Sequence, residues 1–244
     1  MVRRFRGGEG MSPRAPVDTV LLDAGGVLIM PAAEAVLRSL RDGGARADLA
    51  LIDRAHYAAT AVNDRFPPRN RLSYLKAFAR ACGIHDDRAE RVIAELSAAY
   101  DGPKWTRELP GAAKSLRSLS SLPVALGVVS NSVGLVAEQL RRAGICQVGP
   151  GAGTPVSLVI DSALVGVAKP DPGIFHLALR ELGAEPERTV YVGDTARIDV
   201  DGALAAGIRP LHLDPHRDCP DPPGRHEHLR GLGDLAAWVR AHGR

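Results

Sequence analysis

The sequence predicts an α/β protein, a doubly wound parallel sheet interrupted early by an all-helical insertion. Short apolar runs alternate with helix-length segments from residue 110 onward, as parallel βαβ units require. Residues 31–109 are instead rich in Ala, Arg and Leu at helical spacing. We therefore expect three parts: a disordered leader (1–16), a core built from 17–30 and 110–244, and a helical domain (31–109) inserted into it.

The length, composition and charge of the chain indicate how many domains it has and whether it binds nucleic acid. A chain of 244 residues suits one large domain, or one domain that carries a smaller insertion. Its 31 Lys and Arg against 28 Asp and Glu give a formal charge of +3, without a basic block of the kind that binds nucleic acid. We expect no nucleic-acid partner.

The leader and the cysteines indicate a soluble cytoplasmic protein. Residues 1–16 are rich in Arg, Gly and Pro and lack the apolar centre of a secretory signal, and Met11 is an alternative start. No apolar run approaches the roughly 20 residues that span a bilayer, so no membrane partner is expected. Cys82, Cys146 and Cys219 are odd in number and widely spaced, which favours neither a disulfide framework nor a zinc site.

The first part of the chain predicts one strand and then four helices. Residues 17–28 form an apolar run with β-branched residues that ends in Asp23 and Gly25-Gly26, which is typical of a buried strand followed by a tight turn. Gly and Pro then punctuate the inserted segment at positions where helices end. The four helices are expected within residues 32–44, 48–66, 71–84 and 86–100.

From residue 110 helices and strands alternate. The helices are expected within residues 111–122, 133–145, 172–183 and 199–207, and the strands within 123–131, 156–162, 189–194 and 209–214. A Pro-rich loop (215–225) and an amphipathic helix (232–243) close the chain. His216, His226 and His228 lie in or beside that loop without a fourth ligand at useful spacing, so we expect them to be solvated surface residues.

Several strand ends carry residues suited to phosphate chemistry. Asp23 follows the first strand, where open α/β sheets place their active sites, although an Asp there can also cap a turn. Ser130 and Asn131 end the next strand before a helix, which is either an anion site or an ordinary helix cap. Lys169 precedes a Pro-Asp-Pro turn and suits a point charge for a phosphate or carboxylate, or a plain surface position.

A fourth strand end carries two carboxylates. Asp194 follows Gly193 at the end of the predicted strand, and Asp199 comes five residues later on the same loop. Oxygen-rich pairs of this kind favour Mg²⁺, whereas the competing interpretation is ordinary capping of the next helix.

The order of these motifs resembles the haloacid dehalogenase superfamily over roughly residues 17–214, most specifically in the stretch SLVIDSALVGVAKPDPGIFHLALRELGAEPERTVYVGDTARIDVDGALAAG. The resemblance implies a Rossmann-like core with a helical cap of the first cap subclass. It also implies a small phosphorylated substrate that is hydrolysed through an aspartyl-phosphate on Asp23. Ser130, the backbone of Asn131, and Lys169 would hold the phosphoryl oxygens. Implied Mg²⁺ ligands are Asp23, the carbonyl of Gly25, Asp194 and Asp199.

Gly25 departs from the family's phosphatases, which carry a second Asp two residues after the nucleophile as general acid and base. Such help contributes about 10² to 10⁴ in rate, so hydrolysis of alkyl phosphates is expected to be weak. Three interpretations stay open: a phosphatase with a substitute acid or a good leaving group, a dehalogenase or phosphonate-cleaving enzyme, and a non-catalytic binding protein. The retained acidic pair disfavours a dehalogenase, and the mid-helix position of Lys76 disfavours a Schiff base. We favour a Mg²⁺-dependent phosphatase.

Substrate contacts are expected in the cap. Arg65 and Arg69 flank Pro67-Pro68, where either could bind a second anionic group of the substrate or simply be a solvated residue at a helix end. A monomer or a homodimer is expected.

Overall fold

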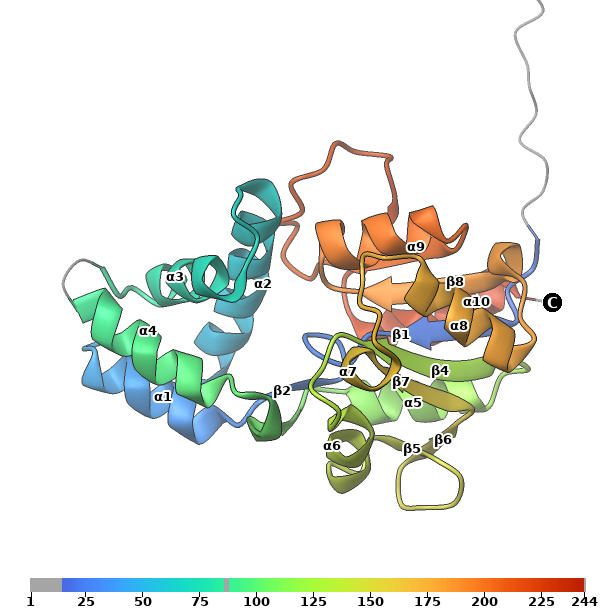
Figure 1. The fold of residues 1–244 in the computed structure, drawn as a ribbon, viewed down its shortest axis with the longest axis horizontal. Helices are drawn as coiled ribbons and strands as arrows, with labels where there is room; N and C mark the ends of the chain where they lie inside the picture. Colours follow the sequence, from blue (N-terminus) through green and yellow to red (C-terminus); the bar gives the residue numbers. More distant parts are fainter. Residues whose placement is uncertain (1–14, 86–87, 244) are drawn as a thin grey trace, which may run out of the picture.

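The computed structural model describes residues 15–85 and 88–243, so residues 1–14 of the predicted leader lie outside the described residues. A six-stranded sheet with the order β10-β9-β8-β1-β4-β7 lies at the centre of one half of the molecule (Figure 1). All its pairings are parallel, which confirms the predicted α/β sheet. The strands are β1 (Thr19–Leu22), β4 (Ala125–Ser130), β7 (Leu158–Asp161), β8 (Thr189–Gly193), β9 (Arg209–Leu213) and β10 (Glu227–Leu229).

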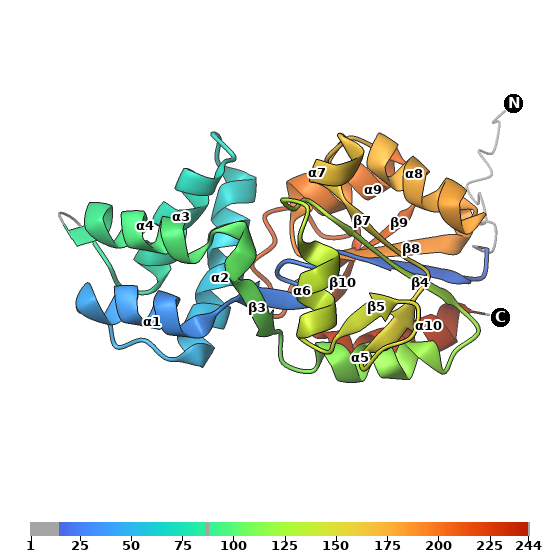
Figure 2. The same ribbon diagram turned by 60° about the horizontal axis from the view of Figure 1, so that its bottom comes forward.

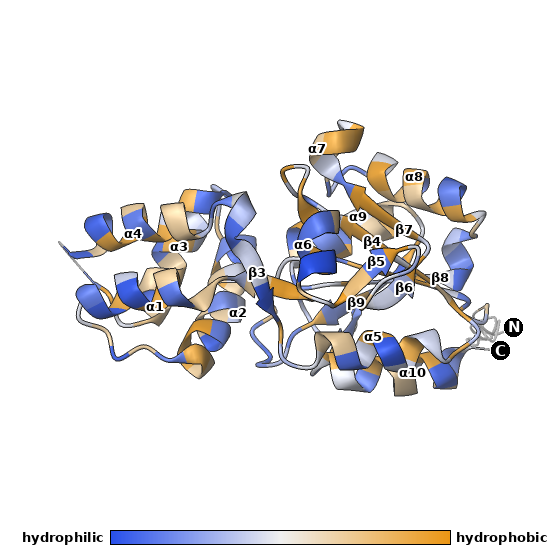
Figure 3. Cartoon of the chain, turned by 90° about the horizontal axis from the view of Figure 1, so that it is seen from below, coloured by the Kyte–Doolittle hydropathy of each residue, from blue (hydrophilic) through white to orange (hydrophobic). Residues whose placement is uncertain are grey.

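Helices cover both faces of this sheet (Figure 2). Successive strand residues point to opposite faces, so Leu22 of β1 packs in one apolar cluster with Leu116 and Val239, while Leu21 packs in another with Phe175 and Ala203. One face is covered by α5 (Ala112–Ser120), α6 (Val136–Arg142) and α10 (Leu235–His242), and the other by α8 (Gly173–Leu182) and α9 (Asp201–Ala205). The strands are accordingly largely hydrophobic, whereas these helices carry hydrophilic stripes (Figure 3).

The inserted segment contains four helices, as its composition predicts. They are α1 (Ala33–Asp42), α2 (Leu49–Arg65), α3 (Arg71–Ala81) and α4 (Arg88–Ala99). Asp48 and Asn70 cap α2 and α3, because their side chains accept hydrogen bonds from the first-turn backbone. The helices bury an apolar cluster of their own around Phe78, so the insertion does not depend on the sheet for its core.

Several short elements are not predicted by the sequence. Two antiparallel strands, β2 (Ile29–Pro31) and β3 (Trp105–Glu108), connect the helical insertion to the sheet. A second small pair, β5 (Cys146–Val148) and β6 (Thr154–Val156), precedes β7, and the short helix α7 (Ser162–Val165) follows it. Strands of three or four residues joined across long sequence separations leave almost no periodic signal.

Within the part of the chain that the structure describes, no helix combines the length and apolar character needed to cross a membrane.

Candidate active site

Three neighbouring strands deliver predicted residues to one edge of the sheet. Asp23 and Asp194 follow β1 and β8, and Ser130 is the last residue of β4. Because β1 pairs in parallel with both β4 and β8, these three ends lie side by side. The carboxyl edge of a parallel sheet is the usual site of ligand binding in this architecture.

Asp23 is held in a defined position at the centre of this edge. Its backbone N–H donates to the carbonyl of Val192 at 2.8 Å, and its Oδ1 accepts from the backbone N–H of Ala24 at 2.7 Å. Burial raises the pKa of Asp23 to about 7, with a contribution from the neighbouring carboxylates, while Lys169 opposes the shift. The negative charge of this buried carboxylate therefore depends on a nearby cation.

Lys169 is that cation. Its Nζ lies 3.0 Å from Oδ1 of Asp23, 2.7 Å from Oδ1 of Asp199 and 2.7 Å from the hydroxyl of Tyr191, with the side chain 1% exposed. Burial alone would lower the pKa of Lys169, but the two carboxylates raise it above its usual value. Asn131 fixes the Lys169 backbone, because its amide donates to the Lys169 carbonyl at 2.9 Å and its oxygen accepts from the Lys169 N–H at 2.8 Å.

Asp199 is enclosed by donors. Oδ1 accepts from Lys169 and from Tyr191 at 2.9 Å, and Oδ2 accepts from the backbone and hydroxyl of Thr195 at 3.0 and 2.6 Å. Burial opposes its charge, but Lys169, Thr195 and Tyr191 hold the pKa of Asp199 below its usual value. Asp199 lies in a π-helical turn, residues Ala196–Val200, that replaces the first part of the predicted helix.

The helical insertion reaches into this edge through α2. Nε2 of His56 lies 2.8 Å from Oδ2 of Asp194, and Nδ1 of His56 lies 2.8 Å from the hydroxyl of Tyr74 on α3. The motifs of the sequence assign no role to His56. The available signal was the spacing of His56, Thr60 and Asp64, which places three polar residues on one face of a helix.

Further along the same face, Asp64 binds the backbone after Asp194. It accepts from the N–H groups of Ala196 and Arg197 at 2.5 and 3.2 Å. Burial raises the pKa of Asp64 to about 7, although the two backbone donors oppose this. Tyr57 adds a third contact by donating to the carbonyl of Gly26 at 3.1 Å. Helix α2 is thus fastened to both the first and the last motif of the core.

A cavity of about 620 Å³ lies between the insertion and the sheet edge. The core side is lined by Asp23, Gly25, Ser130, Asn131 and Asp194, and the insertion side includes His56, Asn63, Arg69, Arg71, Tyr74 and Trp105. Its volume is that of a site for a metabolite-sized ligand. The cavity therefore places the acidic edge against polar and cationic groups of the insertion.

A match to a protein-family model over most of the chain identifies its family. A family model described as haloacid dehalogenase-like hydrolase matches residues 17–207, which is most of the chain. The chain belongs to this family. It is therefore a haloacid dehalogenase-like hydrolase, and the relatives it resembles include named phosphatases.

Two of these relatives illustrate the similarity. The chain is 35% identical over 140 residues to a phosphoserine phosphatase of Thermus thermophilus, covering 51% of this chain and 54% of the relative. It is 33% identical over 128 residues to a glyceraldehyde 3-phosphate phosphatase of Methanopyrus kandleri, covering 51% and 52%. The chain spans about half the length of these curated relatives.

Solved structures share the fold over nearly the whole chain. The putative hydrolase YfnB of Bacillus subtilis, bound to magnesium, has a TM-score of 0.59 at 18% identity and covers 92% of this chain and 99% of its own. A phosphatase of this family from Thermococcus onnurineus has a TM-score of 0.56 at 18% identity, covering 93% and 100%. At this identity the likeness shows the fold alone.

Of the two arginines predicted to meet substrate, the cavity includes one. Arg69 lines it, and its Nε donates to the carbonyl of Asp64 at 2.9 Å. Arg65, the exposed last residue of α2, is not among the lining residues. The substrate contact expected for Arg65 stays a prediction.

The glycine pair after Asp23 is explained by contacts. Gly26 has φ +71°, and a Cβ there would overlap Oδ2 of Asp194 and come within 2.5 Å of Nε2 of His56. Gly25 has no positive φ, and a Cβ there would approach the Trp105 ring at 3.0 Å. Gly26 is required by backbone and space, whereas Gly25 is limited by one side chain.

The prediction of solvated histidines in the C-terminal segment is wrong for two of the three. His226 has a side chain that is 0% exposed and His228 one that is 26% exposed, and both cluster with His212 and Cys219. The cluster forms because β9 and β10 pair in register, which places His228 beside His212. His216 is exposed, as predicted.

Proposed function

We propose that this hydrolase is a Mg²⁺-dependent phosphatase that acts on a small phosphorylated metabolite through an aspartyl-phosphate on Asp23. The observation that carries the proposal is the 3.0 Å contact between Nζ of Lys169 and Oδ1 of Asp23, at a carboxylate that lines the cavity. A buried carboxylate with a fixed cation beside it suits covalent catalysis on an anionic substrate.

The reaction has two steps. An oxygen of Asp23 attacks phosphorus, the bond from phosphorus to the ester oxygen breaks, and the leaving oxygen takes a proton. Water then attacks phosphorus, inorganic phosphate leaves, and the Asp23 carboxylate is restored. Ser130 and the Asn131 backbone bind the phosphoryl oxygens at the end of β4, while Lys169 balances the negative charge around Asp23.

The acidic residues fit a divalent cation. Carboxylate oxygens of Asp23, Asp194 and Asp199 lie within 4.8 Å of one another, and oxygen donors are what Mg²⁺ prefers. We assign Asp23, Asp194 and the Gly25 carbonyl as ligands. Asp199 supports them by orienting Lys169, since both its oxygens already accept hydrogen bonds. Bound Mg²⁺ supplies positive charge against which the phosphoryl oxygens are neutralised.

His56 acts as the proton donor in place of the Asp that is absent at Gly25. Gly25 has no side chain to protonate the leaving oxygen, whereas the His56 ring lines the same cavity and touches Asp194. Histidine is the side chain that active sites use most often for proton transfer. The Tyr74 hydroxyl, 2.8 Å from Nδ1, orients the ring.

The residues on the insertion side of the cavity suggest which class of substrate it binds. Arg69 and Arg71 line it together with Asn63, which suits a second polar or anionic group on a small phosphate ester. The named relatives act on phosphoserine and glyceraldehyde 3-phosphate, and both are compounds of this class.

A panel of phosphate esters, including these two compounds, tests the proposal with and without Mg²⁺. We expect phosphate release that requires the metal and is lost in Asp23→Asn. Phosphate release that persists in Asp23→Asn, or its absence across the panel at every metal concentration, would contradict the proposal.

The carbon–halogen alternative is separated by isotope labelling. In single turnover in H₂¹⁸O, attack of water on phosphorus places ¹⁸O in the released phosphate. Hydrolysis of an alkyl ester of Asp23 would place ¹⁸O in the aspartate itself. We expect labelled phosphate and an unlabelled Asp23 peptide.

A further inference from the structure

A second group of potential metal ligands lies behind the active site. His212 on β9, Cys219 in the following loop, and His226 and His228 at β10 each offer one donor atom, and these four atoms lie within 4.8 Å of one another. Nδ1 of His212 is 3.1 Å from Nε2 of His226, which is 3.6 Å from Sγ of Cys219. Three imidazoles and a thiol therefore converge on one point.

The spacing matches a tetrahedral zinc site. With Zn–N bonds of about 2.0–2.1 Å and Zn–S bonds of about 2.3 Å, neighbouring donors of a tetrahedron are separated by about 3.3–3.6 Å. The contacts of 3.1 and 3.6 Å are close to these edge lengths. One thiolate and three imidazoles are also a donor set that suits zinc better than Mg²⁺.

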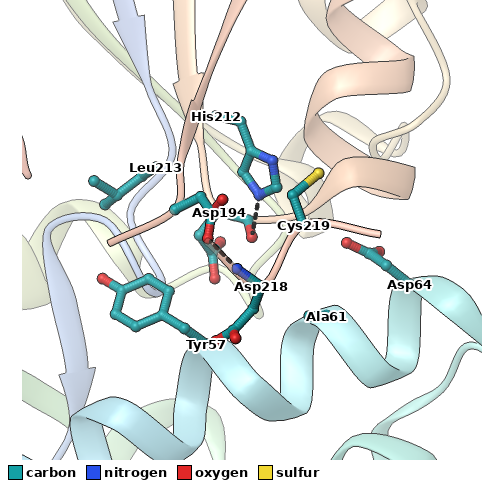
Figure 4. Close-up of a pocket in the computed structure, with 9 residues that line it drawn as sticks. Tyr57, Ala61, Asp64, Asp194, His212, Leu213, Asp218 and Cys219 are labelled. Atoms are coloured by element: carbon teal, nitrogen blue, oxygen red, sulfur yellow. Dashed lines mark hydrogen bonds between the residues drawn. The ribbon is translucent and has the colours of Figure 1, made fainter. Parts of the chain in front are cut away.

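The outer hydrogen bond of His212 leaves a lone pair of this ring facing the cluster. Nε2 of His212 lies 3.1 Å from the carbonyl oxygen of Asp194. A carbonyl can only accept, so this nitrogen carries the proton, and in the neutral ring Nδ1 presents its lone pair to the cluster. Figure 4 shows this bond, with Cys219 beside the ring.

Aspartates stand behind the other two rings. Nδ1 of His228 lies 3.2 Å from Oδ2 of Asp214, and Nδ1 of His226 lies 3.8 Å from Oδ2 of Asp221. A carboxylate behind the distal nitrogen of a ligating histidine is the usual support in zinc sites, because it fixes the ring and its protonated nitrogen. Of the three rings, His212 thus has a hydrogen-bonded acceptor on the side away from the cluster, whereas His226 and His228 each face a carboxylate without a hydrogen bond to it.

We infer that His212, Cys219, His226 and His228 form a structural zinc site that ties the loop 214–226 to the sheet. All four donors are protein groups, as in closed structural sites rather than catalytic ones. The site joins β9, the loop and β10, and through the bond from His212 to the Asp194 carbonyl it supports the active-site loop. This inference does not depend on the proposed reaction.

The loop lies against the insertion, so the site also affects its docking. A small pocket is lined by Cys219 and Asp218 of the loop together with Tyr57 and Ala61 of α2 (Figure 4). Asp218 accepts hydrogen bonds from Arg54 of α2 at 2.5 and 3.1 Å. Zinc would hold the loop in the position from which it makes these contacts.

Metal analysis of the full chain tests the site. The protein, purified from zinc-supplemented medium and passed through a desalting column, should carry one zinc per chain, and Cys219→Ser and His226→Gln should each lose it. His216→Gln is the matched control, because His216 is an exposed histidine of the same loop outside the cluster, and it should retain zinc. Wild-type protein without zinc, or equal loss in His216→Gln, would overturn the inference.

Cobalt substitution covers the case in which the variants do not fold. Apoprotein prepared with a chelator and titrated with Co²⁺ should develop the intense visible bands of tetrahedral cobalt and a thiolate charge-transfer band, and excess Mg²⁺ should not displace it. Asp214→Asn should weaken Co²⁺ binding by about 10- to 100-fold, as loss of an outer carboxylate does in other sites. Octahedral spectra without the thiolate band would contradict the assignment.

Discussion

Nε2 of His56, on a helix of the insertion, lies 2.8 Å from Oδ2 of Asp194 at the end of a core strand. The same Asp194 oxygen and the same nitrogen are the atoms that a Cβ at Gly26 would strike. The absence of a side chain at Gly26 and the contact of His56 with Asp194 are therefore two aspects of one arrangement. The proposed proton donor comes from the insertion rather than from the first motif.

Replacing the imidazole of His56 tests its role as proton donor. His56→Gln should lower kcat for alkyl phosphates by about 10²-fold, because proton transfer to a poor leaving group is typically worth 10² to 10⁴. For nitrophenyl phosphate, whose leaving group needs no proton, kcat should change far less. Steady-state kinetics on both substrates measures the difference, and equal losses on both would assign His56 to positioning alone.

Restoring an acid at Gly25 gives a complementary test. Gly25→Asp should fold, because its backbone has no positive φ, and should raise kcat for alkyl phosphates once the Trp105 ring shifts by a few tenths of an ångström. Gly25→Asn has nearly the same volume but carries no acid, so it should not produce the gain. A gain in both variants would show that packing against Trp105, and not proton transfer, limits turnover.

The adjacent glycine should behave in the opposite way. Gly26→Ala combines a positive φ with overlap of His56 and Asp194, so it should lower the unfolding free energy by about 1–3 kcal/mol through backbone strain alone, with steric overlap adding to the loss. Urea denaturation measures the change. Stability at the wild-type level would mean that this turn is not formed as described.

Removing the buried cation should affect both stability and activity. Lys169→Met leaves Asp23 and Asp199 facing each other without their shared partner, and breaking such a buried pair typically costs about 3–5 kcal/mol. The double variant Lys169→Met/Asp199→Asn should recover part of the lost stability in urea denaturation but none of the activity. Recovery of turnover would remove Lys169 from the proposed phosphate site.

The sequence predicts the core motifs well because each depends on local chain features. An apolar run with β-branched residues ends at Asp23, and a strand ends at Asp194, so local sequence features are enough to place both residues at the sheet edge. The parallel order of the sheet then brings them together. Lys169 is brought to Asp23 by the turn and the Asn131 contacts that follow from the same motifs.

Contacts between distant segments could not be predicted in this way. His56 contacts Asp194 only because α2 of the insertion packs against the core. The hydrophobic periodicity of the sequence does not indicate this packing. The cluster of His212 with His228 depends on the pairing of β10, a three-residue strand, with β9. Without that pairing, the sequence around these histidines is that of a polar loop, which predicts solvated side chains.

The central claim is that Asp23 becomes phosphorylated, and trapping the intermediate tests it most directly. Enzyme mixed with a reactive phosphate ester and Mg²⁺ is quenched during turnover and treated with borohydride, which reduces an aspartyl-phosphate to homoserine, and the peptides are then sequenced by mass spectrometry. We expect homoserine at position 23, and none in the same experiment without substrate. Phosphate release under the same conditions with Asp23 unmodified at every quench time would contradict it.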